Sequence, residues 1–536
     1  MAVVQISRIQ MRRGQKNAGS GLPQLASGEI GWAVDTQEMY IGNGAVSEGA
    51  PAVGNSKILT EHDNIFTFAN TYTYKDNGLQ TGASATTPIK RTLQSKIDDV
   101  VNAKDFGVLN DGSNVTVALQ RAIDQLFLNS ATKASSSSRV ILNLGPGEYL
   151  INDTIFLPPY TSIVGAGADK TVINASTNTA FKMVNSSSLP GAPANESTTD
   201  TSNQSRNILM EGMTIKQTTA HTALELQSTK DSIFRNIKFY GPWSVGDSVN
   251  IGQTAIHAVS ISTSVTCENN AFENCKFTKW SYPFRSTEDI VYNKFENCTF
   301  DTNVHGIVLG QGTVLGSPNQ LTGPSNNYIT SCTFEEIARE AIWVETGTHN
   351  RSSGNTFLNV GNVNGTEAAG AYSIIKYVDK HNTSTEDYFK RFELLSYSPT
   401  FFTGQKFTPI ISGRCISTLN FGDELPVVNQ DPALRFFKLP GDADVSYTIE
   451  YVYKSTAVTA YRSGVLNITL DAVNADLIVR DDFDYVGDTS YQTNLELTAN
   501  FVDDNADATK ETVEVTIKNT TSADVGTFKF RVTQRR

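Results

Sequence analysis

The chain has 536 residues, more than one ordinary domain requires, so several structural units are expected. Its formal net charge of −12 argues against a nucleic-acid-binding role, because a phosphate backbone requires a basic face. Only 18% of the residues are charged, and Phe and Tyr outnumber Trp, which is typical of short strands and turns. The composition therefore predicts an all-β protein without a nucleic-acid partner.

The five cysteines are an odd number, and three of them recur at one position of a repeated phrase described below. We expect them to be reduced and to behave as small apolar residues, in a protein that folds in a cytoplasm. The opening MAVVQISRIQMRRG lacks a long apolar core and a cleavage site, so we expect no secretion signal. No apolar run is long enough to span a membrane, and no membrane partner or cofactor is expected.

Residues 1–62 are predicted to form a small β module. Ile30, Trp32 and Val34 alternate on one face, a turn follows at DTQE, and Met39 and Ile41 continue the pattern, which indicates a hairpin. The segments IQMRRG and LASGEIGWAVDTQEMYIGNG resemble the N-terminal domain shared by many bacteriophage tail fibres and receptor-binding proteins. The resemblance implies a virion-proximal module that attaches to other tail or baseplate proteins. The alternative is a generic β-hairpin module.

Residues 63–100 are expected to form a connector with a short helix over 92–101. The next segment, AKDFGVLNDGSNVTVALQRAIDQL, contains an apolar helical stripe that could cover the open end of a solenoid. The stripe consists of Val117, Leu119, Ile123, Leu126 and Phe127. This segment and the following VILNLGPGEYLINDTIFLPPYTSIVGAGADKTVI resemble the opening coils of the pectate-lyase-like β-helix superfamily. A nucleotide loop at Gly165, Gly167 and Asp169 is rejected, because such a loop requires a helix after it and TVINAST is strand-like.

One six-residue phrase recurs between Met210 and Asn362, separated by filler of variable length. Its copies are MEGMTI at Met210, FRNIKF at Phe234, FENCKF at Phe272, FENCTF at Phe295, ITSCTF at Ile329 and FLNVGN at Phe357. A constant element that recurs with insertions of variable length between its copies is typical of a solenoid. Together with the resemblance, it predicts a right-handed parallel β-helix over residues 101–362.

Each slot of the phrase has a predicted structural role. The third slot is predicted to form a bend between two strands, because Asn tolerates left-handed backbone and could hydrogen-bond to its equivalent one rung away. It holds Asn236, Asn274, Asn297 and Asn359. The fourth slot is expected to stack as an internal apolar ladder. It holds Cys275, Cys298 and Cys332.

The C-terminal third has a different pattern. Residues 363–434 carry aromatic residues without a clean period and are assigned to final coils and a transition. From residue 435 to 536, alternating apolar residues and short turns predict an antiparallel β-sandwich. The clearest strands contain Val445 to Tyr453, Leu466 to Leu470, Leu495 to Phe501, Val513 to Ile517 and Phe528 to Val532. Residues 185–206 are polar and read as an exposed loop.

No complete catalytic signature is present, so catalytic residues are searched for among carboxylates that could converge near a histidine. The weak candidates are Asp301, Glu335, Glu336, Glu345 and His305. The wider set adds Glu268, Glu288, Asp289, Glu340 and His257. The pectinase motifs are missing, with only His305-Gly306 as half of one. The alternative for each carboxylate is a solvated position on an outer wall.

Aromatic residues in the filler could stack on sugar rings, which makes them candidates for carbohydrate binding. They are Trp243, Trp280, Tyr282 and Trp343. The alternative is that they pack between coils or subunits. A calcium-loop spacing at Asp503, Asn505, Asp507 and Glu514 is read as an acidic hairpin tip, because Ala508 replaces the required Gly. No metal is therefore expected.

The order of modules resembles that of tail proteins of marine cyanophages. This resemblance implies a homotrimeric virion tail fibre or tailspike, made in the host cytoplasm, that recognises host-surface polysaccharide. The alternatives are a depolymerase, acting as a glycosidase or lyase, and a purely structural tail or baseplate component. A bacterial surface protein acting on carbohydrate is a weaker alternative, given the tail-type N-terminal module.

Overall fold

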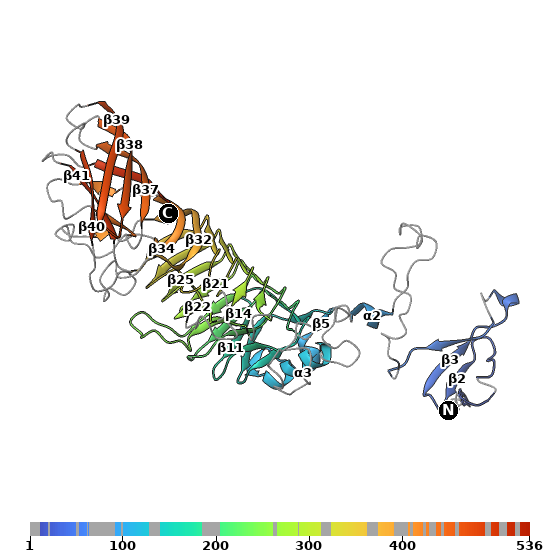
Figure 1. Ribbon diagram of the computed structural model, residues 1–536. Helices are drawn as coiled ribbons and strands as arrows, with labels where there is room; N and C mark the ends of the chain where they lie inside the picture. The colour runs from blue at the N-terminus through green and yellow to red at the C-terminus, as the bar shows by residue number, and fades with distance from the viewer. Residues whose placement is uncertain are drawn as a thin grey trace, which may run out of the picture. The chain divides into compact units, whose positions relative to one another are not determined.

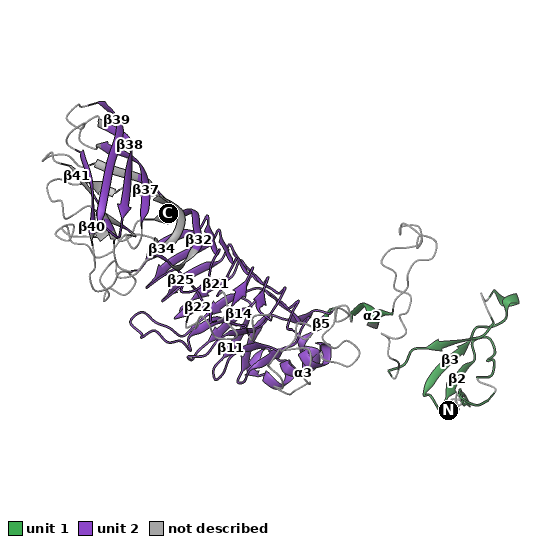
Figure 2. Ribbon diagram, in the orientation of Figure 1, with its two compact units in different colours: residues 1–100 green, residues 101–536 purple. Residues whose placement is uncertain are grey.

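The computed structural model falls into two units, residues 1–100 and 101–536 (Figure 2). The residues that it describes are 11–19, 22–49, 53–61, 63, 92–97, 100–127, 140–184, 204–260, 265–287, 289–311, 323–361, 374–390, 406–407, 411–421, 425–427, 436–440, 444–455, 460–487, 495–502, 512–519 and 526–535. The expected loop over 185–206, Glu288, and the calcium-like positions Asp503, Asn505 and Asp507 lie wholly or mostly outside these ranges.

The first unit contains a four-stranded sheet in the order β1-β2-β3-β4. The strands are β1 (Arg12–Gly14), β2 (Ile30–Ala33), β3 (Glu38–Gly42) and β4 (Asn55–Ile58). Strands β2 and β3 form the predicted antiparallel hairpin, with Ile30 opposite Ile41. A 3₁₀ turn (Val46–Glu48) and helix α2 (Leu93–Ile97) complete its described elements.

The core of this module lies on the face opposite to the alternating apolar set. Leu25, Ala33 and Tyr40 are buried, whereas Ile30 is 40% and Val34 51% exposed. The cause is a close approach of the chain before β2: a Cβ on Gly42 would lie 2.1 Å from the carbonyl oxygen of Ala26. Small residues therefore admit a covering segment on one face, and the larger apolar side chains are left on the other.

The second unit contains a parallel β-helix of three sheets, whose rungs follow one another in Figure 1 from β5 to β34. Sheet 1 comprises β5 (Val101–Asn102), β7 (Leu142–Leu144), β10 (Ser162–Gly165), β13 (Leu209–Glu211), β16 (Ile233–Arg235), β20 (Ala271–Glu273), β24 (Lys294–Glu296), β27 (Tyr328–Thr330) and β30 (Arg351–Ser353). Sheet 2 comprises β6 (Asp111–Asn114), β8 (Gly147–Ile151), β11 (Thr171–Ala175), β14 (Thr214–Gln217), β17 (Lys238–Tyr240), β21 (Lys276–Thr278), β25 (Thr299–Asn303), β28 (Thr333–Ile337) and β31 (Thr356–Val360). Sheet 3 comprises β9 (Ile155–Leu157), β12 (Phe181–Met183), β15 (Leu224–Gln227), β18 (Thr254–Val259), β22 (Tyr282–Ser286), β26 (Ile307–Leu309) and β29 (Ile342–Val344).

The parallel stacking continues beyond the last repeated phrase. Strand β32 (Ile375–Lys390) pairs in turn with β29, β30 and β31, so it supplies one rung to all three sheets. Strand β34 (Ile411–Phe421) then pairs in parallel with β32. A short two-stranded pairing of β19 (Cys267–Glu268) with β23 (Ile290–Val291) precedes sheet 1.

Stacked aromatic rings fill the interior of the β-helix. Phe239, Phe277, Phe300, Phe334 and Phe357 form one column, with successive ring centroids 4.6 to 5.0 Å apart. This spacing matches the distance of about 4.8 Å between neighbouring strands, so each ring lies on its equivalent one rung away. The sixth slot of the phrase therefore faces inward. The first slot does so as well, because Phe234, Phe272 and Phe295 stack with ring centroids 5.3 and 4.8 Å apart.

The last predicted copy of the phrase, at Phe357, is out of register. Phe357 pairs with Phe334, which occupies the sixth slot, whereas the first slot is taken by Ser352 opposite Ile329. The copy is SSGNTF, and a further copy, STEDYF, starts at Ser384. Polar residues fill slots that are apolar elsewhere, which is why an apolar pattern missed both copies.

The third slot adopts the left-handed backbone that was predicted for it. Asn236, Asn274 and Asn297 have φ values of 55°, 51° and 54° at the bend from sheet 1 to sheet 2. Asn359 also has a positive φ, of 51°, but it lies within β31 of sheet 2, because its copy was out of register. These asparagines are the bend formers, but a different asparagine column makes the ladder of hydrogen bonds.

That ladder lies two residues before each first slot, in the bend into sheet 1. Its members are buried and hydrogen-bond from one rung to the next. They are Asn270, Asn293, Asn327, Asn350 and Asn382. In each step the backbone N–H and the side-chain Nδ2 of one asparagine donate to the Oδ1 of the next, as from Asn293 to Asn327 at 3.0 Å for both. Because every buried amide finds a partner, the column can replace apolar packing at this corner.

The cysteines of the fourth slot are free and buried, as predicted. Each thiol also lies against a backbone carbonyl of the preceding rung, with Cys275 Sγ 3.3 Å from the Phe234 oxygen and Cys298 Sγ 3.3 Å from the Phe272 oxygen. In the following rungs Asn355 and Asp387 take the same slot. The fourth slot therefore satisfies a carbonyl as well as filling space.

Helix α3 (Thr116–Phe127) packs against the first rungs through Leu119, Ile123 and Phe127, which are fully buried. Val117, included in the predicted stripe, is 70% exposed, because it precedes the buried face by a helical half-turn. The Gly165–Asp169 segment is followed by strand β11 rather than a helix, consistent with rejection of a nucleotide loop.

The C-terminal region consists of two sheets whose strands pair antiparallel, except for the parallel pair of β33 with β36. One sheet contains β35 (Leu425–Val427), β37 (Val445–Ser455), β38 (Ala460–Asp471), β39 (Asp476–Gly487) and β42 (Gly526–Arg535). The other contains β33 (Lys406–Phe407), β36 (Phe436–Pro440), β40 (Leu495–Val502) and β41 (Thr512–Asn519). Apolar side chains such as Tyr447, Ile468 and Val515 are buried, as the alternation predicted. The described residues contain no helix long and apolar enough to cross a membrane.

Candidate functional site

The outward side of sheet 3 carries a row of residues with different chemistry on consecutive rungs. Its members are in parallel register, and all except Val308 are half-buried. The row consists of Phe156, Lys182, Glu225, His257, Arg285, Val308, Trp343 and Lys376. We call it the sheet 3 row. Alternation along each strand directs these side chains away from the core, so folding alone does not require their chemistry.

The centre of the row is held by a network around Arg285. Its Nε donates to Gln311 Oε1 at 3.1 Å, and Gln311 Nε2 donates to the Tyr282 hydroxyl at 3.3 Å. The guanidinium carbon lies 6.0 Å from the Tyr282 ring centroid. Burial lowers the pKa of Arg285, while the negative charge of Glu345 acts in the opposite direction. The remaining guanidinium donors lie on the outward side of a sheet rather than in its core.

Trp343 is the large aromatic residue of the row. The Lys376 Nζ lies 5.2 Å from its ring centroid, and the His305 ring centroid lies 5.8 Å away. His305 in turn stacks on Tyr282 at 4.9 Å. Residues from three rungs therefore place a cation, an indole and an imidazole next to one another.

His305 and Glu340 form a buried acid–base pair beside Trp343. The Nδ1 and Oε2 atoms are 3.2 Å apart, and the two side chains are 2% and 7% exposed. Burial raises the pKa of Glu340, but the His305 imidazole outweighs this effect and holds that pKa below its usual range. A carboxylate paired with an imidazole is an arrangement that can accept or donate a proton.

Two buried nitrogens in the row have no hydrogen-bond partner in the described part of the chain: His257 Nε2 and Trp343 Nε1. Burial lowers the pKa of His257 to about 4, and the charges of Arg285 and Lys182 add to that effect. His257 is therefore neutral at pH 7, when one ring nitrogen can donate and the other accept. Unsatisfied buried polar atoms are rare in native proteins and are frequently satisfied by a ligand or water.

The structure brings several sequence candidates together here: His257, His305, Glu340, Glu345, Tyr282 and Trp343 all belong to this network. It does not bring the other catalytic candidates to the same place. Asp301 and Glu335 lie in register on the outward side of sheet 2, and Lys276 Nζ is 2.9 Å from Asp301 Oδ2. Glu336 lies within β28 at a positive φ of 54°, where its Oε1 accepts from Asn359 Nδ2 at 2.7 Å.

Two of the proposed stacking platforms are packed inside the protein. Trp280 belongs to the main core, and Trp243 packs against Val304 and Ala338; both are fully buried. Their rings therefore occupy the alternative role of packing between coils. A Cβ on Gly241 would lie 2.5 Å from the Trp280 ring, so this indole fits only because a glycine faces it.

The remaining carboxylates lie in the segments that lead into sheet 1. Glu268 is in β19, where Lys230 Nζ lies 3.4 Å from its Oε1. Asp289 is buried one residue before β23. Neither carboxylate faces the sheet 3 row.

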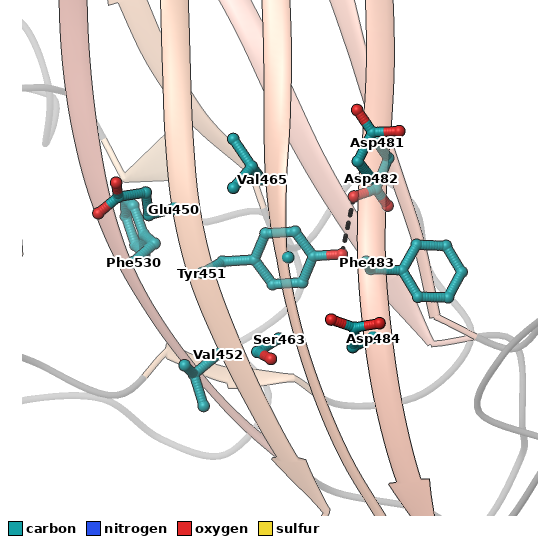
Figure 3. A pocket seen from close by; sticks show the side chains of 11 residues that line it. Glu450, Tyr451, Val452, Ser463, Val465, Asp481, Asp482, Phe483, Asp484 and Phe530 are labelled. Carbon is teal, nitrogen blue, oxygen red and sulfur yellow. Dashed lines mark hydrogen bonds between the residues drawn. The ribbon is translucent and has the colours of Figure 1, made fainter.

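Another candidate is a hollow of about 940 Å³ in the C-terminal sheet, around Tyr451, Asp481 and Phe483 (Figure 3). The Tyr451 hydroxyl donates to Asp481 Oδ1 at 2.8 Å, and Arg462 pairs with the same carboxylate. The Arg462 guanidinium carbon also lies 3.4 Å from the Phe483 ring centroid. The polar groups at the base of this hollow satisfy one another, so the sheet 3 row is the stronger candidate.

Lys182, Arg285 and Lys376 of the row, and Gln311, which hydrogen-bonds to Arg285, were not identified from the sequence. The feature that could have identified the three charged residues is their position in the strands. Each of Lys182, Arg285 and Lys376 stands one residue from an inward-facing residue of sheet 3 and therefore faces outward. Sheet 3 strands lack the repeated phrase, so that register could not be assigned from the phrase.

The parallel β-helix of three sheets is the fold of pectate-lyase-like proteins. The profile of the family described as rhamnogalacturonase A/epimerase, pectate lyase-like, matches residues 100–367, half of the chain. The chain belongs to this family.

A segment of the chain is also similar to the putative phage-related protein YobO of Bacillus subtilis strain 168, with 34% identity over 126 residues. That segment covers 23% of this chain and 12% of YobO. Among solved structures, the ORF18 protein of Geobacillus virus E2 matches with a TM-score of 0.39 and 14% identity, over 96% of this chain and 100% of that one. Tailspike protein 3 of bacteriophage CBA120 matches with a TM-score of 0.38 and 15% identity, over 74% of this chain and 67% of that one.

Proposed function

We propose that the chain recognises a host-surface polysaccharide along the sheet 3 row, as a fibre or tailspike protein of a phage tail. The observation that carries the proposal is the arrangement of Arg285, Trp343 and Lys376 in one register within four consecutive rungs, with Val308 on the rung between Arg285 and Trp343. Aromatic faces stack on sugar rings, and guanidinium and ammonium groups donate hydrogen bonds to hydroxyl or carboxylate oxygens. A row that repeats at the strand spacing suits a linear polymer better than a compact small molecule.

The assignment to a phage tail rests on two supports. The first is the resemblance of residues 1–62 to the N-terminal domain of tail fibres, which gives this module the role of attachment to other tail or baseplate proteins. The second is the similarity of part of the chain to YobO, a putative phage-related protein. The proposed location is the virion tail, and the proposed assembly is a homotrimer. Detection of the chain in intact particles tests the location.

Binding is tested with the full-length chain on an array of bacterial surface polysaccharides. We expect at least one polysaccharide to bind, and Trp343→Ala to weaken that binding about tenfold, since the lost ring contact is worth about 1 kcal/mol beyond the lost burial of the indole. The matched control is Tyr328→Ala. Tyr328 is also half-buried on an outward sheet face with an arginine near its ring, 5.7 Å from Arg351, but it lies on sheet 1.

Equal losses in the two variants would place binding elsewhere than on the sheet 3 row. Absence of binding to every polysaccharide on the array would favour the purely structural role in the tail. Both variants are compared with the parent chain by thermal unfolding, so that a loss of binding is not confused with a loss of folding.

The buried His305–Glu340 pair favours a second candidate function, depolymerase activity at the same place. In a glycosidase or lyase this pair would supply the group that moves a proton to or from the sugar. Incubation of the bound polysaccharide with the chain would then release reducing ends or unsaturated products. Glu340→Gln, which keeps the size of the side chain, is expected to abolish that release while binding on the array persists.

A further inference from the structure

A cluster of lysines lies on the outward side of sheet 2, away from the sheet 3 row. Lys216 and Tyr240 are in register on neighbouring strands, as are Lys238 and Lys276. Lys279 follows β21 and its Nζ lies 5.3 Å from the Tyr240 ring centroid, while the Nζ of Lys216 lies 6.0 Å from it. We call these four lysines, together with Tyr240, the sheet 2 lysine patch.

The patch has more positive than negative charge. Lys238 Nζ is 3.5 Å from Asp169, whose side chain is 88% exposed, and Lys276 Nζ is 2.9 Å from Asp301. Lys216 and Lys279 form no ion pair with a carboxylate in the part of the chain that the structure describes. In a protein with a formal net charge of −12, such a concentration of cations is a local exception. Lys238 and Lys276 stand directly opposite each other on neighbouring strands, where like charges repel, and the carboxylates of Asp169 and Asp301 offset that repulsion.

The patch borders a hollow of about 710 Å³, whose lining includes Lys238, Lys276, Asn236, Asn274, Glu211 and the segment 164–169. The charge of Glu211 is paired with Arg235, whose Nη2 lies 2.8 Å from its Oε2. That segment is held in place by the Gly167 N–H, which donates to the Gly212 oxygen at 2.8 Å. A Cβ on Gly165 would lie 2.3 Å from the same oxygen, so the wall closes tightly only with glycine at this position. The hollow therefore exists before any ligand arrives, and it presents ammonium and amide donors.

We propose that the sheet 2 lysine patch is a second saccharide site, which binds the anionic groups of an acidic polysaccharide. Ammonium groups attract carboxylate, sulfate or phosphate substituents, and the Asn274 amide donates to ring hydroxyls. The net negative charge of the chain repels a polyanion in general, so a polyanion binds where cations gather. The inference rests on the proposed function, which makes the ligand a polysaccharide. It adds that the polysaccharide is acidic and that it binds on sheet 2, a surface separate from the sheet 3 row.

The test uses the full-length chain with dextran sulfate as the anionic probe and unmodified dextran as its uncharged match. The variant is the double substitution Lys216→Gln and Lys279→Gln, which leaves the two ion-paired lysines in place. We expect the variant to bind dextran sulfate about tenfold more weakly and with a smaller dependence on salt. Dextran is expected to show no difference between variant and parent.

The matched control is the double substitution Lys104→Gln and Lys294→Gln, which removes the same charge at exposed positions away from the patch. Equal weakening by the control, or no weakening by the patch variant, would overturn the proposal. Thermal unfolding of both variants checks that the fold is retained.

The two proposals fail separately. If Trp343→Ala leaves binding to the arrayed polysaccharides intact while the patch variant loses dextran sulfate, the sheet 3 assignment fails and the sheet 2 site stands. If Trp343→Ala alone has an effect, the sheet 2 site fails and the proposed function stands.

Discussion

The buried asparagine ladder predicts a large difference between two classes of asparagine in the same rungs. Asn327 is fully buried; its Oδ1 accepts from both Asn293 N and Asn293 Nδ2, and its Nδ2 donates to the Ile290 oxygen at 3.0 Å and to Asn350 Oδ1 at 2.9 Å. Asn297 stands at an exposed bend with a φ of 54°. We predict that Asn327→Ala destabilises the β-helix severely and that Asn297→Gly does not.

The magnitude follows from the partners that each change leaves behind. In Asn327→Ala the Asn293 backbone N–H loses the acceptor that it has in the structure and stays buried, which costs about 1–3 kcal/mol. Three further hydrogen bonds and the side-chain volume are also lost, so the total is about 3–5 kcal/mol. In Asn297→Gly the left-handed backbone is retained by a residue that adopts it freely, and we expect a cost below about 1 kcal/mol.

The assay is unfolding in guanidinium chloride, followed by the fluorescence of the buried Trp243 and Trp280. If refolding is incomplete, the unfolding rate at a fixed denaturant concentration replaces the equilibrium value. Similar losses in Asn327→Ala and Asn297→Gly would refute the assignment of the ladder to the bend into sheet 1.

Two further predictions concern buried ionisable groups. Burial lowers the pKa of His257 from 6.5 to about 4, so the folded state is stabilised above pH 6.5, where the imidazole is neutral. This contribution, about 3 kcal/mol at most, is lost as the pH falls toward 4. In His257→Gln the melting temperature should depend less on pH over that range, and an unchanged pH profile would contradict the reasoning. Burial raises the pKa of Asp387, despite hydrogen bonds from Ser352, Ser384 and Asn355, so its ionisation opposes folding as the pH rises above its unfolded pKa. Asp387→Asn should therefore raise stability at pH 7 by about 1 kcal/mol and leave stability at low pH unchanged, as measured by thermal unfolding at both pH values.

The fold was predictable because the inward slots of the repeated phrase are repetitive. Aromatic residues such as Phe272 and Phe295 recur at fixed offsets, and they stack with ring centroids 4.8 Å apart. The register failed at Phe357 because Ser352, a polar residue, replaced the apolar first slot of the last copy. Strand β39 was also missed, because Asp481 interrupts its apolar alternation and is tolerated only through its pairing with Arg462.

The sequence predicted which types of residue the candidate site contains, but not which individual residues lie together in it. His257, His305 and Trp343 were recognised as residue types that can carry chemistry. Nothing in their spacing indicated that His257 and Trp343 share sheet 3, or that His305, which precedes β26, lies beside Trp343. Arg285 and Lys376 were overlooked because charged residues occur on every outward face. Only the register of sheet 3 separates them from lysines and arginines that serve as solvated surface.

The arrangement of both proposed sites follows from the geometry of the solenoid. Each rung supplies one or two outward side chains to a sheet, about 4.8 Å from those of the next rung, so any binding surface on a single sheet is a row along the stack. Rows on different sheets point in different directions, so one polymer strand lying along the sheet 3 row does not lie along the sheet 2 lysine patch as well. A polysaccharide long enough to fold back, or two separate strands, would engage both. Occupation of the first row raises the local concentration of the polymer at the second row. The affinity for polymers should therefore exceed the affinity for short oligosaccharides by more than the additional contacts along one row can explain.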